Sequence, residues 1–238
     1  MGAALELIDV DIVVGETSIC RGLNLVIGLG ETHVLFGPNG SGKSSLLAAT
    51  MGLPSHRVTA GSIRLFGEPI EDLPVRERAL RGLGMAYQRP PVVQGVSPRG
   101  LATSLGALTE LFNGSALLDL EGLIDRDINA GFSGGETKRW EILKLYLQQP
   151  VMCLFDEPET GVDLEHVGAV GAAIKGLVED EESTRRSALV VAHTGFILDH
   201  LTVDVGHLMI GGRLVYSGDP YELFEHIKTR GYTIPADM

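Results

Sequence analysis

Residues 37–44 read Gly37-Pro38-Asn39-Gly40-Ser41-Gly42-Lys43-Ser44, and this octapeptide decides the fold. It has the pattern G-x-x-x-x-G-K-[S/T], in which backbone N–H groups surround a polyphosphate. The lysine reaches the outer phosphates, the hydroxyl binds Mg²⁺, and the glycines allow close approach of the backbone. The alternative is a glycine-rich turn without a ligand, but a chance match at this many fixed positions is rare. The octapeptide therefore predicts a nucleoside triphosphate site.

The segments on either side of residues 37–44 fit the strand, loop and helix order that the pattern requires. Residues 32–36 read as a buried strand, and residues 45–49 read as the first turns of a helix. The predicted nucleotide-binding residues are Gly37, Pro38, Asn39, Gly40, Ser41, Gly42, Lys43, Ser44 and Ser45.

Length and composition narrow the class of protein. A chain of 238 residues with 44% hydrophobic residues suits one α/β domain with a sizeable core. The formal net charge of −12 argues against a nucleic-acid partner. The two cysteines, Cys20 and Cys153, lack metal-ligand spacing, which predicts a cytoplasmic protein that holds no metal–sulfur cofactor alone. No apolar run approaches the roughly 20 residues of a bilayer span, so we expect no direct membrane insertion.

Apolar runs predict a mostly parallel core sheet beside an antiparallel one. Residues 5–8, 23–27 and 63–66 are separated by turn residues and predict an N-terminal antiparallel β subdomain. Residues 151–155 and 189–192 are continuously apolar, as strands covered on both faces should be. These two runs end at Asp156 and His193. Ligands in such sheets bind beyond the carboxyl ends of the strands, so Gly37, Asp156 and His193 are expected to converge.

Between about residues 89 and 130 the residue pattern changes to short leucine-rich segments interrupted by Gly and Pro. This pattern predicts a small helical subdomain. We expect one domain over residues 1–238, with a catalytic core of about 1–88 and 150–238 and a helical subdomain of about 89–149. Near the end, Gly211-Gly212 predicts a hairpin between residues 208–210 and 213–216. Asp219-Pro220-x-Glu222 predicts the start of a terminal helix.

Two carboxylates follow the buried run at residues 151–155. Asp156 is expected to hold Mg²⁺ beside the Ser44 hydroxyl, and Glu157 to polarise the water that attacks the γ-phosphate. The alternative is an acidic turn before Pro158, which the phosphate-binding octapeptide makes less plausible.

The segment Phe132-Ser133-Gly134-Gly135-Glu136 precedes a helix expected over residues 137–149. Ser133-x-x-Glu136 is a capping box, and two glycines before a helix N-terminus also form an anion site. Together with the octapeptide and Asp156-Glu157, the segment resembles the signature of ABC ATPases. This resemblance implies the P-loop ABC ATPase fold, ATP with Mg²⁺ as cofactors, and an ATP-dependent homodimer. In such a dimer Ser133, Gly134, Gly135 and Glu136 contact the ATP of the other copy.

The resemblance assigns roles to further positions. Gln88 matches the glutamine that contacts Mg²⁺ and the attacking water, which gives a predicted Mg²⁺ set of Ser44, Gln88 and Asp156. Asp163 matches the D-loop aspartate, although it also suits a helix N-cap, and His193 matches the switch histidine beside the catalytic glutamate. The predicted catalytic residues are Glu157, His193 and Gln88. Val14 stands where the family often has an aromatic residue for adenine, so base stacking should be weak.

Residues 132–143 look like the SufC-type ATPases of iron–sulfur cluster assembly, and residues 21–25, 58–63, 95–97, 197–200, 212–219 and 230–232 also resemble that family. This resemblance implies a Suf-type scaffold protein as the partner. The departures are Trp140 in place of a polar residue, a short helical subdomain, and the transporter-like residues 156–163. The alternative is the ATP-binding subunit of a membrane transporter. A third possibility is an ABC ATPase of DNA repair or translation. Proteins of that class usually carry a coiled-coil insertion or a basic surface, and this sequence shows neither.

Overall fold

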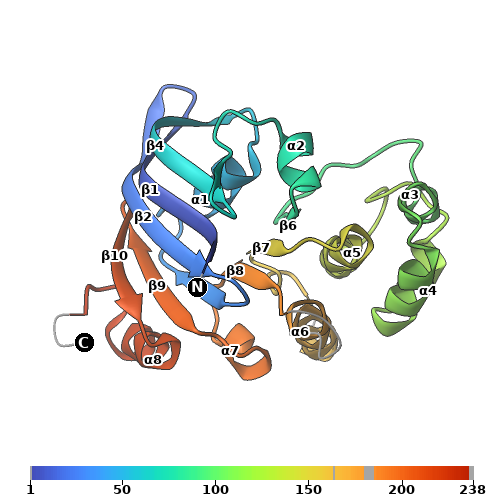
Figure 1. The fold of residues 1–238 in the computed structure, drawn as a ribbon. Coiled ribbons are helices and arrows are strands. Elements are labelled where there is room, and N and C mark those ends of the chain that lie inside the picture. The colour runs from blue at the N-terminus through green and yellow to red at the C-terminus, as the bar shows by residue number, and fades with distance from the viewer. Residues whose placement is uncertain (1, 163, 180–184, 236–238) are drawn as a thin grey trace.

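The computed structural model describes residues 2–162, 164–179 and 185–235. A six-stranded sheet forms its centre (Figure 1). The strand order is β10 (Arg213–Gly218), β9 (Val205–Ile210), β3 (Thr32–Phe36), β8 (Ser187–Val191), β7 (Met152–Asp156) and β6 (Leu83–Ala86). The five strands from β9 to β6 run parallel, and β10 pairs antiparallel with β9. The predicted parallel core sheet is therefore confirmed.

A second, antiparallel sheet covers one face of the central sheet (Figure 1). Its strand order is β2 (Thr17–Gly28), β1 (Ala3–Val14), β4 (His56–Leu65) and β5 (Glu68–Pro69). Inward side chains of β1, β2 and β4 pack with helix α1 (Lys43–Met51) against β3, β7 and β8. This apolar layer confirms the predicted N-terminal antiparallel sheet and anchors the helix that follows residues 37–42.

Helices cover the opposite face of the central sheet. They are α5 (Gly134–Gln148), α6 (Leu164–Val178), α7 (Phe196–His200) and α8 (Pro220–Arg230). Their apolar side chains form a second core with β3, β7 and β8, and Trp140 of α5 is only 1% exposed in it. Burial of a large aromatic side chain is strongly stabilising, so Trp140 belongs to the core although the resemblance led us to expect a polar residue there.

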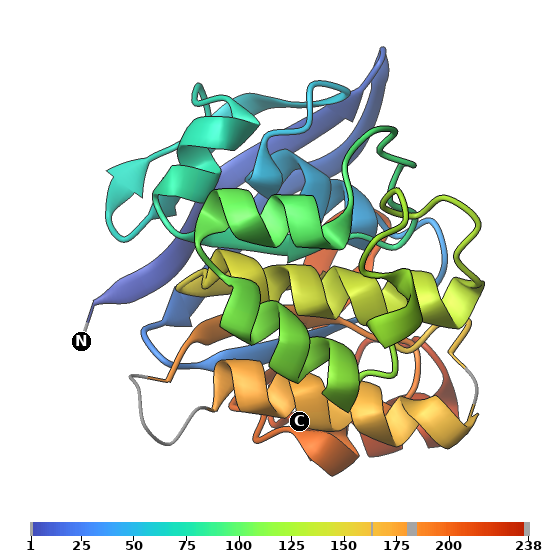
Figure 2. The same ribbon diagram turned by 90° about the vertical axis from the view of Figure 1, so that its right-hand side faces the viewer.

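Short helices lie at the edge of the molecule farthest from the antiparallel sheet (Figures 1 and 2). Helix α3 (Pro98–Leu105), helix α4 (Leu108–Leu117) and the 3₁₀ turn η1 (Glu121–Leu123) follow one another, and α3 and α4 pack on α5. The helical pieces α3, α4 and η1 thus fall within the leucine-rich stretch of about residues 89–130, where short helices were predicted. The boundaries of a separate subdomain at residues 89 and 149 stay a prediction.

Local sequence signals account for the element ends. Helix α5 begins at Gly134, three residues before the expected start, because Ser133 is its N-cap and forms the capping box with Glu136 in the first turn. The Asp219 carboxylate accepts hydrogen bonds from the first turn of α8. Gly211 and Gly212 both have positive φ in the β9–β10 turn, as a two-residue hairpin requires. The sequence reading did not identify helix α2 (Val75–Leu80), strand β6 or helix α7, because each is too short to show a period.

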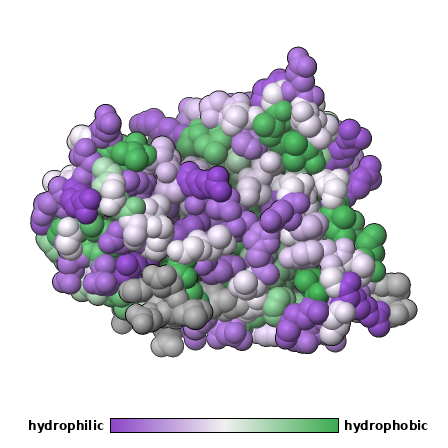
Figure 3. Space-filling view, turned by 180° about the vertical axis from the view of Figure 1, so that it is seen from behind, coloured by the Kyte–Doolittle hydropathy of each residue, from purple (hydrophilic) through white to green (hydrophobic). Residues whose placement is uncertain are grey.

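The outer surface seen from behind carries hydrophobic residues in separate patches among hydrophilic ones (Figure 3). In the part of the chain that the structure describes, no helix combines the length and hydropathy needed to cross a membrane.

A hydrogen-bonded chain through two buried histidines joins β3, β9 and β10. The Glu31 carboxylate lies 3.0 Å from Nε2 of His33, whose Nδ1 lies 2.9 Å from Nε2 of His207, and Nδ1 of His207 lies 2.7 Å from the Ser217 hydroxyl. All three contacts are satisfied when each imidazole is neutral, with Ser217 donating to His207, His207 to His33 and His33 to Glu31. Burial accordingly lowers the pKa of both histidines.

We expect this pair to make the folded state less stable in mild acid. Burial lowers the pKa of His207 from 6.5 to about 3, so between these values the unfolded chain binds a proton that the folded chain does not. The free energy of unfolding should fall by about 2 kcal/mol between pH 7 and pH 5 from His207 alone. Urea unfolding at both pH values measures this, and His207→Gln is the control that lacks the contribution. An equal fall in both proteins would contradict the expectation.

Candidate active site

Residues 37–42 connect the carboxyl end of β3 to the N-terminus of α1, and glycine is required at two of these positions. Gly37 has φ 158°, and a Cβ there would lie 2.2 Å from the Met209 carbonyl oxygen. Gly42 has φ 107°, and a Cβ would lie 2.9 Å from Sγ of Cys20. The loop therefore lies directly against β9 and β2, and its backbone N–H groups precede a helix N-terminus suited to anions.

The Lys43 side chain folds back and binds the main chain at the start of this loop. Its Nζ donates to the carbonyl oxygens of Gly37 at 2.7 Å and Pro38 at 3.0 Å. Burial lowers the pKa of this ammonium group, while the carboxylates of Glu157 and Asp156 raise it. The ammonium group of Lys43 thus lies against the main chain at the start of the loop.

Ser44 and Asp156 meet at the end of β7. The Ser44 hydroxyl donates to Oδ1 of Asp156 at 2.9 Å. Burial raises the pKa of Asp156, and the Ser44 hydrogen bond, Lys138 and Lys43 oppose that rise. A hydroxyl and one carboxylate are the oxygen ligands that Mg²⁺ accepts together with substrate phosphates. The predicted pair therefore fits Mg²⁺, although no group of three or more His, Cys, Asp or Glu side chains forms a metal site among the described residues.

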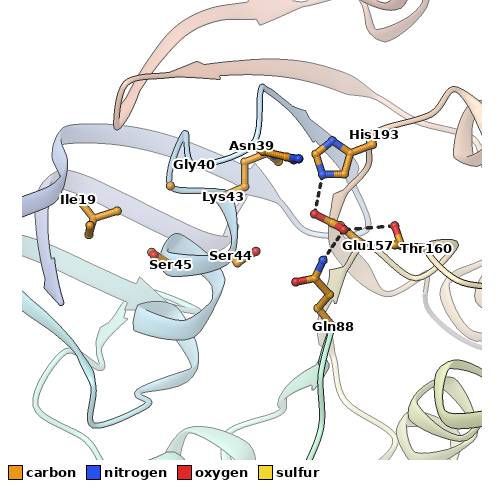
Figure 4. A pocket seen from close by; sticks show the side chains of 11 residues that line it. Ile19, Asn39, Gly40, Lys43, Ser44, Ser45, Gln88, Glu157, Thr160 and His193 are labelled. Atoms are coloured by element: carbon orange, nitrogen blue, oxygen red, sulfur yellow. Dashed lines mark hydrogen bonds and ion pairs between the residues drawn. The ribbon is translucent and has the colours of Figure 1, made fainter. Parts of the chain in front are cut away.

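Three side chains surround the carboxylate of Glu157 (Figure 4). Its Oε1 lies 2.5 Å from Nε2 of His193. Its Oε2 accepts hydrogen bonds from Nε2 of Gln88 at 2.5 Å and from the Thr160 hydroxyl at 3.2 Å. The structure thus brings Gln88, Glu157 and His193 together at the carboxyl ends of β6, β7 and β8. This is the edge at which the strand ends predicted that Asp156 and His193 would meet.

A cavity of about 700 Å³ joins these groups to the loop. Its wall consists of Ile19, Asn39, Gly40, Gly42, Lys43, Ser44, Ser45, Gln88, Glu157, Thr160 and His193. Ile19 contributes an apolar side chain to this wall. Val14, the position at which the family often stacks an aromatic residue on adenine, does not line the cavity. A volume of this size suits a small-molecule ligand.

The signature residues occupy a different place. Ser133, Gly134, Gly135 and Glu136 are not part of the cavity wall formed by the described residues. They form the N-terminus of α5, where the Ser133 side chain accepts from the backbone of Glu136 and the Glu136 side chain accepts from the backbone of Ser133. Asp163 lies outside the described residues.

The loop, the cavity and the signature agree with a known family. A sequence model described as ABC transporter matches residues 20–160, more than half of the chain. The chain belongs to the ABC transporter family. As an ABC ATPase, it binds a nucleotide and hydrolyses ATP.

Individual ABC relatives extend this match over nearly the whole chain. The probable ATP-dependent transporter SufC of Escherichia coli K12 is 34% identical, and the alignment covers 96% of this chain and 97% of that protein. A probable ABC transporter ATP-binding protein of Streptococcus pyogenes serotype M3 is 36% identical, with 96% and 93% covered. A dimeric ATP-binding cassette solved with ADP and Pi has a TM-score of 0.76 at 20% identity, with 91% of this chain and 98% of that chain covered. The fold and the resemblance to SufC-type ATPases are thereby confirmed.

Further residues of this ABC site were missed from the sequence. Thr160 and Ile19 line the cavity, and Lys138 of α5 donates from its Nζ to the carbonyl oxygens of Asp156 at 3.3 Å and Glu157 at 2.9 Å. Thr160 follows Glu157 closely in the chain, so that proximity was an available signal. Ile19 and Lys138 are far in sequence from the phosphate-binding octapeptide and from Glu157, respectively, so neither could be assigned to the site from the residues around it.

Proposed function

We propose that this chain is the ATP-binding and hydrolysing subunit of an iron–sulfur cluster assembly complex. The observation that carries the proposal is the match with E. coli SufC over 96% of this chain and 97% of that protein. The SufC-like segments found in the sequence are spread from residue 21 to residue 232, so they agree with a full-length match.

Within the cavity, we assign the phosphates of ATP to residues 37–45. On ATP binding, the Lys43 ammonium exchanges the Gly37 and Pro38 carbonyl oxygens for phosphate oxygens. Ser44, Asp156 and Gln88 hold Mg²⁺, which neutralises charge on the phosphates when bound. Glu157 accepts a proton from the attacking water, and His193 holds the Glu157 carboxylate through the contact at Oε1.

The signature residues act on a second copy of the chain in this proposal. They are not part of the described wall of their own cavity, yet Gly134 and Gly135 occupy the N-terminal turn of α5, where N–H groups favour anions. The dimeric cassette bound to ADP and Pi shares the fold and supports such an arrangement. We propose that ATP joins two copies and that hydrolysis releases them.

A partner chain holds the cluster and is pulled by the closing dimer. Burial raises the pKa values of the Cys20 and Cys153 thiols to about 12, so both stay protonated at neutral pH. Because the thiolate is the form that ligates iron, neither cysteine is suited to hold a cluster. The absence of suitable cluster ligands in these two cysteines supports a role in which this chain hydrolyses ATP and a separate cytoplasmic scaffold protein holds the cluster.

The second candidate is the ATP-binding subunit of a membrane transporter. Residues 156–163 favour it, as does the S. pyogenes relative that is named as an ABC transporter ATP-binding protein. In that case a separate chain supplies the membrane part. A role on nucleic acid is the third candidate, and the net charge of −12 opposes it.

A pull-down from native lysate distinguishes these candidates. The bait is Glu157→Gln with ATP and Mg²⁺, because a variant that binds ATP without hydrolysing it holds the closed form. We expect a scaffold protein, recovered without detergent and carrying an iron–sulfur cluster, to be identified by mass spectrometry. Lys43→Ala is the matched bait that should lose this partner. Recovery only of a polytopic membrane protein, and only in detergent, would instead make the chain a transporter subunit.

A further inference from the structure

The main chain at His193 leaves the sheet and needs a hydrogen-bond partner. Strands β7 and β8 pair as far as Asp156 and Val191. Glu157, the residue that follows β7, donates its N–H to the Val191 carbonyl oxygen at 3.1 Å. Its φ of 49° then turns the chain away from β8. The N–H of His193 lies beyond this last pairing, and it donates to a side chain.

That side chain is the carboxyl group of Glu159. Its Oε1 accepts from the His193 N–H at 3.3 Å and lies 3.5 Å from the Thr194 hydroxyl. Glu159 is only 8% exposed. It sits in the tight turn after Glu157, in which the Thr160 N–H bonds to the Glu157 carbonyl oxygen and the Val162 N–H bonds to that of Glu159. The turn directs the Glu159 side chain inward, toward the end of β8.

The environment of this carboxyl group suits a hydrogen-bond acceptor for backbone rather than an exposed charge. Burial raises the pKa of Glu159, and the neighbouring Glu157 carboxylate raises it further. The N–H groups of Glu159 itself, His193 and Thr194 oppose this rise. A neutral carboxyl group keeps its carbonyl oxygen as an acceptor, so the contact with His193 does not require ionisation.

We propose that Glu159 is a positioning residue for ATP hydrolysis: it fixes the main chain at His193 so that the imidazole meets Glu157. His193 has two anchors, the Glu159 carboxyl at its backbone and the Glu157 carboxylate at Nε2. Without the first anchor the imidazole loses its fixed approach to Oε1 of Glu157. The inference rests on the roles proposed for Glu157 and His193, and it holds whichever partner chain the ATPase serves.

Two variants test this role on the purified chain. Glu159→Leu removes the acceptor and leaves an apolar side chain, whereas the isosteric Glu159→Gln keeps a carbonyl oxygen in its place. We expect Glu159→Leu to lower kcat for ATP hydrolysis roughly tenfold or more while KM changes little, because the general base Glu157 loses its fixed contact with the His193 imidazole. Glu159→Gln should restore most of the activity. Nitrogen-15 NMR of the imidazoles should show the His193 signals displaced in Glu159→Leu and near their original positions in Glu159→Gln.

A double-mutant cycle with His193→Ala separates positioning from general stability. If Glu159 acts through His193, Glu159→Leu causes no further loss of kcat in the His193→Ala background. The same loss in both backgrounds, full activity of Glu159→Leu, or a Glu159→Gln variant as impaired as Glu159→Leu would each overturn the proposal.

The cycle also stays informative if one variant fails to fold. Thermal unfolding of every protein is measured, and Glu159→Asp, whose shorter side chain withdraws the acceptor, replaces Glu159→Leu if the leucine variant does not fold. Failure of Glu159→Leu to affect hydrolysis counts against Glu159 alone. Loss of the scaffold in the pull-down counts against the proposed function alone, because the kinetic test uses no partner.

Discussion

Replacing Glu157 by glutamine is expected to lower the rate of ATP hydrolysis about 100-fold or more while ATP still binds. An amide does not accept the proton of the attacking water, so the step assigned to Glu157 is lost. The amide oxygen can still accept hydrogen bonds from Gln88 and Thr160, so the cavity should keep its shape. Phosphate release measures the rate, and fluorescence of a labelled ATP analogue measures the affinity.

The same variant should accumulate the closed dimer. Because ATP persists between the two copies, light scattering after gel filtration should show a dimer with ATP and Mg²⁺ and a smaller species without them. The matched control is Glu121→Gln, which changes an exposed glutamate outside the cavity wall. Full turnover by Glu157→Gln would reject the assignment of the general base, and a monomer in ATP would reject ATP-driven dimerisation.

Replacing Lys43 by alanine should instead weaken nucleotide binding strongly. The Lys43 ammonium is the cation of the cavity wall, and its Nζ already lies 2.7 Å from a loop carbonyl oxygen where phosphate oxygens would compete for it. Loss of two charge-assisted hydrogen bonds at about 1.5 kcal/mol each should weaken ATP binding roughly 100-fold. Isothermal titration calorimetry measures the dissociation constant.

A second readout protects this test against a folding defect. ATP should raise the melting temperature of the original protein and leave that of Lys43→Ala almost unchanged, because a ligand stabilises only the state it binds. Lys175→Ala, on an exposed position of α6, serves as the control that keeps the full shift. An unchanged dissociation constant in Lys43→Ala would overturn the phosphate-binding role of residues 37–44.

Much of the site could be anticipated from the sequence because its parts obey local rules. The octapeptide, the capping box at Ser133 and the N-cap at Asp219 involve residues within a few positions of each other, so each motif can be read in isolation. The convergence of Gly37, Asp156 and His193 followed from a general property of parallel sheets, whose carboxyl strand ends share one edge. In the structure β3, β8 and β7 are neighbours, and at their carboxyl ends Lys43 contacts Gly37, Ser44 contacts Asp156 and His193 contacts Glu157.

The sequence by itself determined the phosphate-binding loop, the ABC fold and the strand ends from which the acidic and imidazole side chains project. Only the tertiary structure decided which side chains meet there. The positive φ of Glu157 turns the chain so that Glu159 points back to the His193 backbone. The packing of α5 on the central sheet brings the Lys138 ammonium to the Glu157 carbonyl oxygen. Such contacts depend on the local direction of the backbone and on the packing of elements that are distant in sequence. The linear pattern of residue types specifies neither of these.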